Sequence, residues 1–290
     1  MVSIPRKTFT FFIAPTIALM LFIGVYPMIY SLYISFHHFI LTKNTPPVFI
    51  GFDNFIKVLT DSSFHKSVAN TLTYTGIVVP LDMLLGLGLA LLLAKKLRFS
   101  TYYRIIVIIP TMMAPVAAAW LWKFIYYPTY GLFDTILTVV GIGPQLLTSR
   151  PETALLALVI VDIWQFTPFT FLIFYSALLA LPITPFEAAQ MDGASAWQKF
   201  RHLTLPMLAP VTLVILLLRL TQSLVLFDAV FAITQGGPGY ATHTVSFLLW
   251  RIGMALSLNI GYASAMSWYV NFLVVGIAII LIRSLGRMTR

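Results

Sequence analysis

Residues 181–206 read LPITPFEAAQMDGASAWQKFRHLTLP and stand between two long apolar stretches of the chain. Thr184 is a favourable N-cap, Pro185 suits the first helical position, and Glu187 follows the cap by three residues, so together they predict a capping box. Gly193 predicts the end of this short helix, because glycine readily adopts the left-handed backbone conformation.

A second helix is predicted directly after the glycine bend. Ser195 and Gln198 have the spacing of another capping box, and Pro206 marks the beginning of the next apolar stretch. An ordered knob rich in small residues can dock into a groove on a partner protein. Local physics leaves a second interpretation equally open, in which these surface helices merely connect two apolar stretches.

The apolar stretches on either side of this loop belong to a set of six. A helix that crosses a bilayer needs about 20 mostly apolar residues. Such stretches occur at roughly 9–36, 68–93, 102–124, 153–181, 207–234 and 262–282. Because an isolated segment in lipid must satisfy its own backbone hydrogen bonds, each stretch is predicted to be a helix. The sequence therefore predicts an all-α membrane protein with six transmembrane helices.

The composition agrees with a membrane protein. Charged residues make up 9% of the 290 residues and hydrophobic residues 59%, whereas a soluble domain is about 25% charged. This excludes an ordinary soluble enzyme and a disordered chain. The net charge of +9 is spread thinly, without a run of Lys or Arg, and this argues against binding to nucleic acid. The absence of cysteine excludes disulfides and thiolate metal sites.

The distribution of Lys and Arg predicts the orientation of the chain. When both termini are placed in the cytoplasm, 11 of these residues fall on inside segments and 6 on outside segments, as the positive-inside rule requires. The inside residues are Arg6, Lys7, Lys95, Lys96, Arg98, Arg104, Lys199, Arg201, Arg283, Arg287 and Arg290.

No catalytic motif is present. The chain lacks the Gly-x-x-x-x-Gly-Lys-Ser/Thr loop that binds nucleotide phosphates, and it lacks His-Glu-x-x-His and Gly-x-Ser-x-Gly. The chain is therefore not expected to be an enzyme or to bind a cofactor or a metal.

The loop also carries a family resemblance. Glu187-Ala188-Ala189, then Gly193, then Leu203-Thr204-Leu205-Pro206 matches the EAA loop of ABC importer permeases, with Leu203 where the family usually has Ile. Further matches lie along nearly the whole chain and resemble carbohydrate permeases of the MalF/UgpA type. They are Asn70-Thr71-Leu72, Val78-Val79-Pro80, residues 110–115, Trp120-Leu121-Trp122, residues 164–169, Phe227-Asp228 and residues 234–239.

The resemblance implies a type I ABC importer permease fold, with a single transmembrane domain over residues 1–290 in the inner membrane. It implies four kinds of partner: a second permease subunit, a dimeric cytoplasmic ABC ATPase that binds ATP and Mg, an extracytoplasmic sugar-binding protein, and the sugar itself. The loop at about 182–206 would contain the coupling helix, which inserts into a cleft of the ATPase. The residues implied in this coupling are Glu187, Ala188, Ala189, Asp192 and Gly193.

Ionisable residues within the spans are candidates for the substrate path, since charge in a membrane is costly. In the fourth span Asp162, Gln165, Phe166 and Phe169 lie on one helical face. The resemblance places them in the substrate cavity. Polar groups for hydroxyls beside an aromatic surface suit a sugar.

In the fifth span the resemblance places Arg219 and Ser223 in the same cavity. A structural alternative stays open, in which Asp162 and Arg219 only pair with each other. Asp228, beside the outer mouth, is expected to have a structural or gating role. Asp82, placed near the outer end of the second span, receives no role, although Gly86-x-x-x-Ala90 close to it allows a close helix contact.

The leading interpretation is thus a permease subunit of an ATP-driven sugar importer. The alternative is an ion-coupled secondary sugar transporter that acts without an ATPase, with Asp82, Asp162 and Asp228 as its ion sites. The sequence leaves open whether the substrate is a disaccharide, a glucoside, a polyol or an acidic sugar.

Overall fold

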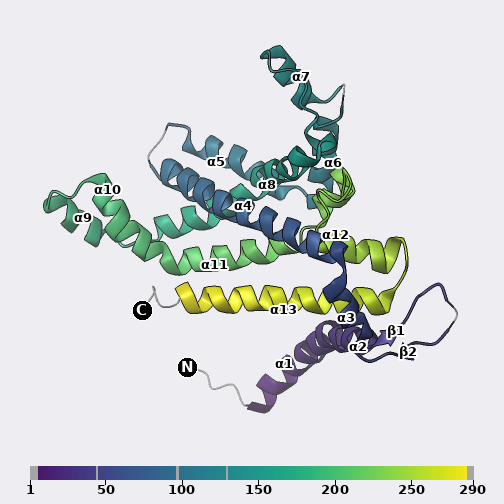
Figure 1. The fold of residues 1–290 in the computed structure, drawn as a ribbon. Helices are drawn as coiled ribbons and strands as arrows, with labels where there is room; N and C mark the ends of the chain where they lie inside the picture. Colours follow the sequence, from purple (N-terminus) through teal and green to yellow (C-terminus); the bar gives the residue numbers. More distant parts are fainter. Residues whose placement is uncertain (1–5, 44, 96–97, 129, 286–290) are drawn as a thin grey trace. The chain divides into compact units, whose positions relative to one another are not determined.

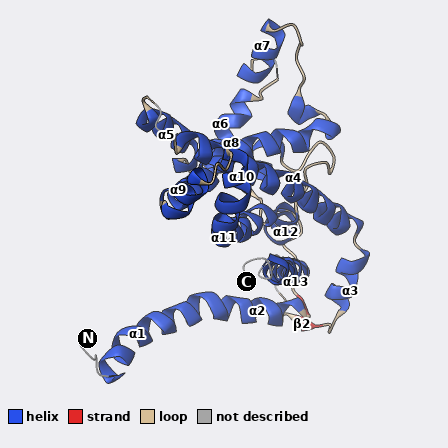
Figure 2. Ribbon diagram, turned by 90° about the vertical axis from the view of Figure 1, so that its left-hand side faces the viewer, coloured by secondary structure: helices blue, strands red, loops and turns tan. Residues whose placement is uncertain are grey.

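The protein is almost entirely helical in the computed structural model, which describes residues 6–43, 45–95, 98–128 and 130–285 (Figures 1 and 2). The one strand pair in these ranges joins β1 (His37–His38) to β2 (Val48–Phe49) in antiparallel register, with His37 opposite Phe49. The chain divides into two compact units. One comprises Met1–Phe64 and Leu248–Phe272, and the other His65–Phe247 and Leu273–Arg290.

The first unit begins with one long helix. It consists of α1 (Arg6–Met20), the π-helical turn η1 (Leu21–Val25) and α2 (Tyr26–Ser35). This confirms the first predicted span. The rest of the unit holds the strand pair, α3 (Asp53–Thr60), the π-helical turn η6 (Arg251–Ala255) and the first half of α13 (Ile260–Leu285). Helix α13 corresponds to the sixth predicted span.

Short polar contacts join these elements of the first unit. The side-chain amide of Asn54 donates to the backbone carbonyls of Ser35 and His37, each at 2.9 Å. The hydroxyl of Tyr262 donates to Asp61 Oδ2 at 2.6 Å. Burial raises the pKa of Asp61, but the hydrogen bonds from Tyr262 and from two backbone N–H groups outweigh it and lower this pKa overall.

The second unit is built on three long helices, α4 (Ser62–Leu93), α8 (Pro151–Leu179) and α11 (Leu205–Leu224). Of the residues in the apolar window of α8, 56% are buried, against 6% in the first helix of the chain, so α8 is the central helix of its unit. The hydrophobic core between the three helices consists of Ala90, Leu93, Phe171, Phe174, Leu208 and Ile215.

The third predicted span is not a single helix. The chain forms α5 (Ser100–Ile108) and the 3-10 turn η2 (Ile109–Met112), then bends by 98° into α6 (Pro115–Ile125). Ala114 is extended, with φ −60° and ψ 135°, because the ring of the following proline excludes the helical conformation from the preceding residue. The described chain thus holds five helices long enough to cross a membrane and one bent pair.

The fifth predicted span begins earlier and ends earlier than expected. A continuous helix runs from α10 (Ala196–Lys199) through the π-helical turn η4 (Phe200–Thr204) into α11 and stops at Leu224. Residues 225–227 are not helical, and a separate π-helical turn η5 (Val230–Thr234) follows. The expectation that the helix continues to residue 234 is therefore wrong.

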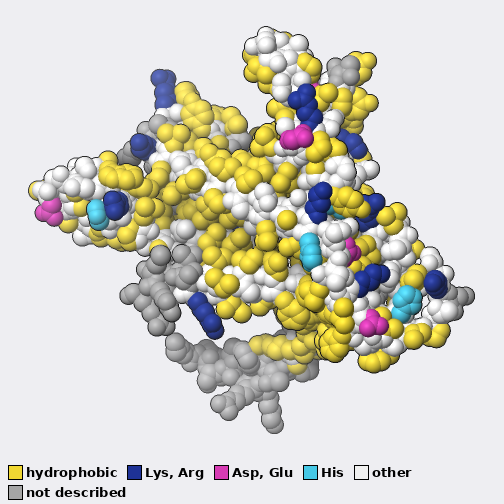
Figure 3. All heavy atoms as spheres, viewed as in Figure 1, with side chains coloured by type: hydrophobic (Ala, Val, Ile, Leu, Met, Phe, Trp, Pro, Cys, Tyr) yellow, Lys and Arg dark blue, Asp and Glu magenta, His cyan; other side chains and the backbone are white. Residues whose placement is uncertain are grey.

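The remaining elements of the second unit are short. They are α7 (Leu132–Val139), the 3-10 turn η3 (Leu147–Ser149), α9 (Thr184–Met191) and the beginning of α12 (Val245–Trp250). Helices α9 and α10 form a tip of this unit, which carries charged side chains, whereas the adjoining surface of α11 and α4 is mostly apolar (Figures 1 and 3).

The positions of the ends of the three long helices agree with the prediction that successive loops lie on opposite sides of the membrane. Leu93, Phe174 and Leu208 share one cluster, so the loops after α4 and α8 lie at the same end of the unit. At the opposite end the side-chain amide of Asn70 donates to the carbonyl of Tyr240 at 2.8 Å. Lys96, Arg287 and Arg290, which contribute to the predicted cytoplasmic orientation, lie outside the described residues, and the orientation stays a prediction.

Candidate functional site

The first half of the loop between α8 and α11 is the helix α9, but it does not begin as predicted. Ile183 is the N-cap, and its carbonyl accepts hydrogen bonds from the N–H groups of Phe186 and Glu187 at 2.9 and 3.1 Å. Thr184 is already the first residue of α9, and no side chain caps the N-terminus of this helix. The predicted capping box of Thr184 and Glu187 is therefore wrong by one residue.

The glycine bend after α9 is confirmed. Gly193 has φ +76°, a conformation that costs other residues roughly 1–2 kcal/mol. The N–H of Ala194 donates to the carbonyl of Ala189 at 2.9 Å, and the N–H of Gly193 donates to the carbonyl of Gln190 at 3.1 Å. These two bonds are a Schellman motif, which satisfies carbonyls that the end of the helix leaves without a partner.

The second capping box is also confirmed. The N–H of Gln198 donates to Ser195 Oγ at 3.3 Å, and the N–H of Ser195 donates to Gln198 Oε1 at 2.7 Å. The helix that begins here continues past Pro206, the residue predicted to mark the beginning of the fifth span. The π-helical turn η4 precedes this proline and carries the helix into α11 without a break.

The tip formed by α9 and α10 exposes apolar side chains together with its charges. Ile183 is 71% exposed, Met191 88% and Trp197 64%. Glu187, Ala188 and Asp192 are exposed as well, and Ala189 is half-buried. Apolar side chains beside charges at a protruding tip are typical of a surface that binds another protein.

Ionic contacts inside the second unit join all three long helices. Arg219 on α11 is fully buried, and its Nε donates to Asp82 Oδ2 on α4 at 2.8 Å. Its Nη2 donates to Asp82 and to Asp162 on α8. The predicted pairing of Asp162 with Arg219 is therefore present, but a second carboxylate shares the guanidinium.

Hydroxyl groups satisfy the remaining oxygens of this Asp82–Asp162–Arg219 cluster. Tyr74 donates to Asp162 Oδ2 at 2.5 Å, and Thr167 Oγ1 donates to Asp82 Oδ1 at 2.9 Å. Thr170 Oγ1 donates to the backbone carbonyl of Asp82 at 2.9 Å. Buried charges persist in proteins when they are paired and hydrogen-bonded in this way.

The structure corrects the placement of Asp82. It lies in the interior of α4, twenty residues after Ser62 and eleven before Leu93, rather than near the outer end of the span. A Cβ at Gly86 would lie 2.1 Å from Thr170 Oγ1 and 3.0 Å from the backbone nitrogen of Phe171, so only glycine allows α4 to approach α8 here. The Gly86-x-x-x-Ala90 pattern was the sequence signal for this contact.

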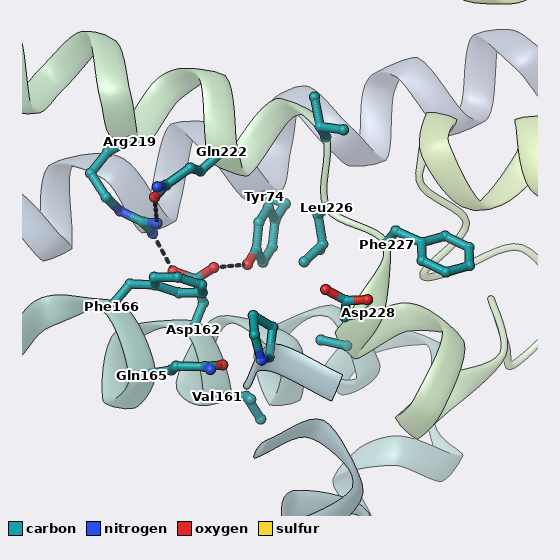
Figure 4. A pocket seen from close by; sticks show the side chains of 13 residues that line it. Tyr74, Val161, Asp162, Gln165, Phe166, Arg219, Gln222, Leu226, Phe227 and Asp228 are labelled. Carbon is teal, nitrogen blue, oxygen red and sulfur yellow. Dashed lines mark hydrogen bonds and ion pairs between the residues drawn. The ribbon is translucent and has the colours of Figure 1, made fainter. Parts of the chain in front are cut away.

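A cavity of about 260 Å³ lies beside the cluster (Figure 4). It is bounded by α4, α6, α8, α11 and the segment that follows α11. The lining residues are Tyr74, Pro115, Val161, Asp162, Gln165, Phe166, Arg219, Gln222, Val225, Leu226, Phe227, Asp228 and Ala229.

The cavity brings together some of the residues expected to line it. Asp162, Gln165, Phe166 and Arg219 are present, whereas Phe169 and Ser223 are not among the lining residues. Ser223 is buried, and its hydroxyl donates to the carbonyl of Leu220 at 3.1 Å. Sequence reasoning did not place Tyr74 and Gln222 here, and it gave Asp228 only a structural or gating role.

Two contacts fix the polar wall of the cavity. The guanidinium carbon of Arg219 lies 4.6 Å from the centre of the Phe166 ring, a cation–π contact. The amide of Gln165 donates to the carbonyl of Met113 at 3.2 Å. Met113 stands in the bend between α5 and α6, so the broken third span is attached to α8 at the cavity.

Comparisons with known proteins agree with this arrangement. A family model described as "binding-protein-dependent transport system inner membrane component" matches residues 83–287. The trehalose/maltose transport system permease protein MalF of Thermococcus litoralis is 34% identical over 272 residues, which cover 91% of this chain and 92% of that protein. The sn-glycerol-3-phosphate transport system permease protein UgpA of Yersinia pestis is 31% identical, with 83% and 82% covered.

A solved structure shares the fold. It is the crystal structure of a bacterial ABC transporter involved in the import of the acidic polysaccharide alginate. One of its chains superimposes with a TM-score of 0.82 at 23% identity, covering 98% of this chain and 97% of that one. With a family model that spans most of the sequence, relatives matched over nearly their whole length and this fold, the chain belongs to the binding-protein-dependent transport system inner membrane components, the permease subunits of ABC importers.

Proposed function

We propose that this chain is a permease subunit of an ATP-driven, binding-protein-dependent sugar importer and forms half of the substrate path. One observation carries the proposal. The helices that border the exposed α9–α10 tip, α8 and α11, are the same helices that contribute Asp162, Gln165, Phe166, Arg219 and Gln222 to the cavity. Movement of the tip therefore acts directly on the cavity wall.

The partners follow from the family and are part of the proposal. They are a second permease of related fold, a cytoplasmic ABC ATPase dimer that binds ATP and Mg, and an extracytoplasmic sugar-binding protein. The lipid of the inner membrane surrounds the apolar helices. This chain carries no nucleotide-binding loop, so the hydrolysis of ATP belongs to the partner.

The residues have two roles in this scheme. Glu187, Ala188, Ala189, Asp192 and Gly193 form the docking surface for the ATPase, at the predicted cytoplasmic end of α8 and α11. Asp162, Gln165, Phe166 and Arg219 form the wall of the substrate path, joined by Tyr74, Gln222 and Asp228. Closure of the ATPase dimer on ATP would push the tip and turn the path from inward-facing to outward-facing.

The alternative of an ion-coupled transporter loses its support. Its ion sites needed Asp82, Asp162 and Asp228, but Asp82 and Asp162 both bind the guanidinium of Arg219. Membership in a binding-protein-dependent family also favours a chain that works with partners.

Reconstitution of the importer tests the proposal. The two permeases, the ATPase and the binding protein are placed in proteoliposomes, and sugar uptake and ATP hydrolysis are measured together. Gly193→Pro is expected to abolish uptake while the complex still assembles, because proline cannot adopt φ +76°.

Gly141→Pro is the matched control. Gly141 has φ +84°, no heavy atom lies within 4 Å of an added Cβ at either glycine, and both N–H groups donate to a carbonyl three residues earlier. The control suffers the same local strain in another loop and is expected to keep ATP-driven uptake. Normal uptake by Gly193→Pro, or gradient-driven uptake by permease without ATPase, would overturn the proposed function.

A further inference from the structure

We infer that the cavity in this chain selects uncharged carbohydrates and rejects anionic ones, and that Asp228 is the residue that discriminates between them. The inference rests on the proposed function and goes further, because the family does not set the charge of the substrate. The names of the two relatives include an uncharged disaccharide and a phosphate ester. Selection between uncharged and anionic substrates must therefore depend on the cavity of each chain.

Among the residues that the structure describes, Arg219 is the only cationic one that lines the cavity, and four of its five N–H groups already donate to other side chains. Its Nε and Nη2 donate to the carboxylates of Asp82 and Asp162, and its Nη1 donates to Gln222 Oε1 at 3.0 Å. Phe166 covers one face of the guanidinium, and no part of the side chain is exposed. An anionic substrate would have to break the buried ion pairs before it could bind this arginine.

The polar groups that do face the cavity have the opposite character. Gln222 is exposed and Asp228 is half-buried, whereas Asp162 and Gln165 are only 5% and 4% exposed. In Figure 4 the carboxylate of Asp228 points toward the middle of the cavity, from the segment that follows α11. The cavity wall and the cluster behind it carry three carboxyl groups and one guanidinium, so acidic groups outnumber basic ones.

This arrangement suits a neutral polyhydroxyl ligand. Carboxylate and amide oxygens accept hydrogen bonds from hydroxyl groups, and the face of Phe166 offers an apolar surface for the sugar ring. The volume of about 260 Å³ lies just below the usual range of roughly 300–1,000 Å³ for ligand pockets, so this half of the path accommodates one sugar unit at a time. A carboxylate or phosphate on that unit would meet Asp228 at close range.

Direct binding to the purified importer tests the inference. The complex of both permeases with the ATPase is used without the binding protein, whose own selectivity would mask the cavity. The probes are the methyl glycosides of glucose, galactose and mannose and the corresponding methyl uronides. In each uronide a carboxylate replaces the hydroxymethyl group at C6. Affinity is measured by calorimetry or by saturation-transfer NMR. We expect at least one neutral glycoside to bind about tenfold more tightly than its uronide, which corresponds to about 1.4 kcal/mol of binding free energy.

Asp228→Asn isolates the contribution of this chain. The variant is expected to raise the affinity for the uronide relative to that for the neutral glycoside at least fivefold, whatever it does to the binding of either sugar alone. Glu152→Gln is the matched control, because it removes an exposed carboxylate of the same unit that does not line this cavity, and it should leave the ratio unchanged.

The outcomes separate the two claims. Equal or tighter binding of the uronides by the wild-type importer, or an unchanged ratio in Asp228→Asn, overturns the inference and leaves the proposed function intact. Binding of no glycoside of either kind, together with no ATP-driven sugar uptake in proteoliposomes, overturns both.

Discussion

The buried cluster of Asp82, Asp162 and Arg219 and the exposed tip formed by α9 and α10 both belong to the second unit, but different contacts hold them together. In the cluster the partners come from three helices, and Arg219 lies 137 residues from Asp82 along the sequence. In the tip the hydrogen bonds around Gly193 and Ser195 span three to five residues. The charged side chains of the cluster are buried, whereas the acidic side chains of the tip are exposed.

The two regions differ in the contacts that determine their structure. Local bonds determine the shape of the tip, so the tip keeps its form when the surrounding helices move. The cluster exists only while α4, α8 and α11 hold their places, because each helix supplies one member. A change in the arrangement of these helices must therefore either carry the cluster as one body or break it.

The largest expected effect comes from removing the shared cation. Arg219→Met leaves two carboxylates buried next to each other, and breaking a buried ion pair costs about 3–5 kcal/mol. We expect a large fall in the melting temperature of the purified importer. Combining Arg219→Met with Asp82→Asn and Asp162→Asn should restore most of the loss, because no buried charge then remains. A wild-type melting temperature for Arg219→Met alone would contradict the structural importance of the cluster.

A smaller effect is expected at the helix contact that lies one turn from Asp82. Gly86→Ala would place a methyl group against Thr170 and the backbone of α8, and such overpacking costs about 1–3 kcal/mol. Gly88→Ala is the matched control on the same helix, since nothing lies within 4 Å of an added Cβ there. It should stabilise the protein by about 0.5–1 kcal/mol. Thermal unfolding of the two variants should thus shift in opposite directions, and shifts of equal sign would refute the close contact.

A substitution in the tip should change docking more than stability. Ser195→Ala removes the capping oxygen of α10, which costs about 1 kcal/mol of local helix stability. The long helix that follows is held by its own packing, so we expect little change in the melting temperature but weaker association with the ATPase in a pull-down titration. Ser195→Asp keeps an acceptor at the N-cap and should bind the ATPase as the wild type does. Equal loss in both variants would mean that the serine hydroxyl contacts the partner directly.

The smallest effect concerns a charge outside the membrane-spanning helices. The lowered pKa of Asp61 means that its ionised form stabilises the folded state. This contribution is fully present above the ordinary carboxyl pKa of about 3.9 and is lost as the pH falls through the folded-state pKa. Asp61→Asn should lower stability near pH 7 by less than about 1 kcal/mol, and the deficit should shrink as the pH falls below about 4. Unfolding curves at pH 7 and pH 3 check the sign.

The same distinction between local hydrogen bonds and contacts between distant residues explains which features the sequence could predict. The bend at Gly193 and the box of Ser195 and Gln198 were correct because glycine conformation and capping depend on near neighbours. The box at Thr184 failed because the helix gains one more residue at its start, and boundaries are the weakest part of such predictions. Asp82 could not be assigned a partner, since no rule of spacing joins residues on three separate helices.

The helices themselves were predictable to different degrees. Long apolar stretches predicted membrane-length helices, and the first, fourth and sixth lie within a few residues of the predicted bounds, whereas α4 begins six residues earlier than predicted. The bend of 98° could not be predicted, because prolines inside membrane helices commonly cause only kinks. Of the 13 residues that line the cavity, the sequence placed four beside one another: Asp162, Gln165 and Phe166 on one helical face, and Arg219. The lining residues from Val225 to Ala229, Asp228 among them, depend on α11 ending at Leu224, whereas Tyr74 and Pro115 come from helices for which the sequence predicted no cavity position.

The uninterrupted helix from Ala196 to Leu224 has a mechanical consequence. Its 29 residues form a rod about 44 Å long, and Arg219 lies about 35 Å from the end at the tip. With the cluster as a fulcrum, a tilt of about 5° at Arg219 displaces the far end by about 3 Å, roughly half a helical turn. In such a tilt the helix would act as a lever, with a long arm that ends at the tip and a short arm that ends at the cavity. A displacement of a few ångströms at the tip would therefore become a displacement of less than about 1 Å at Leu224, at the edge of the cavity.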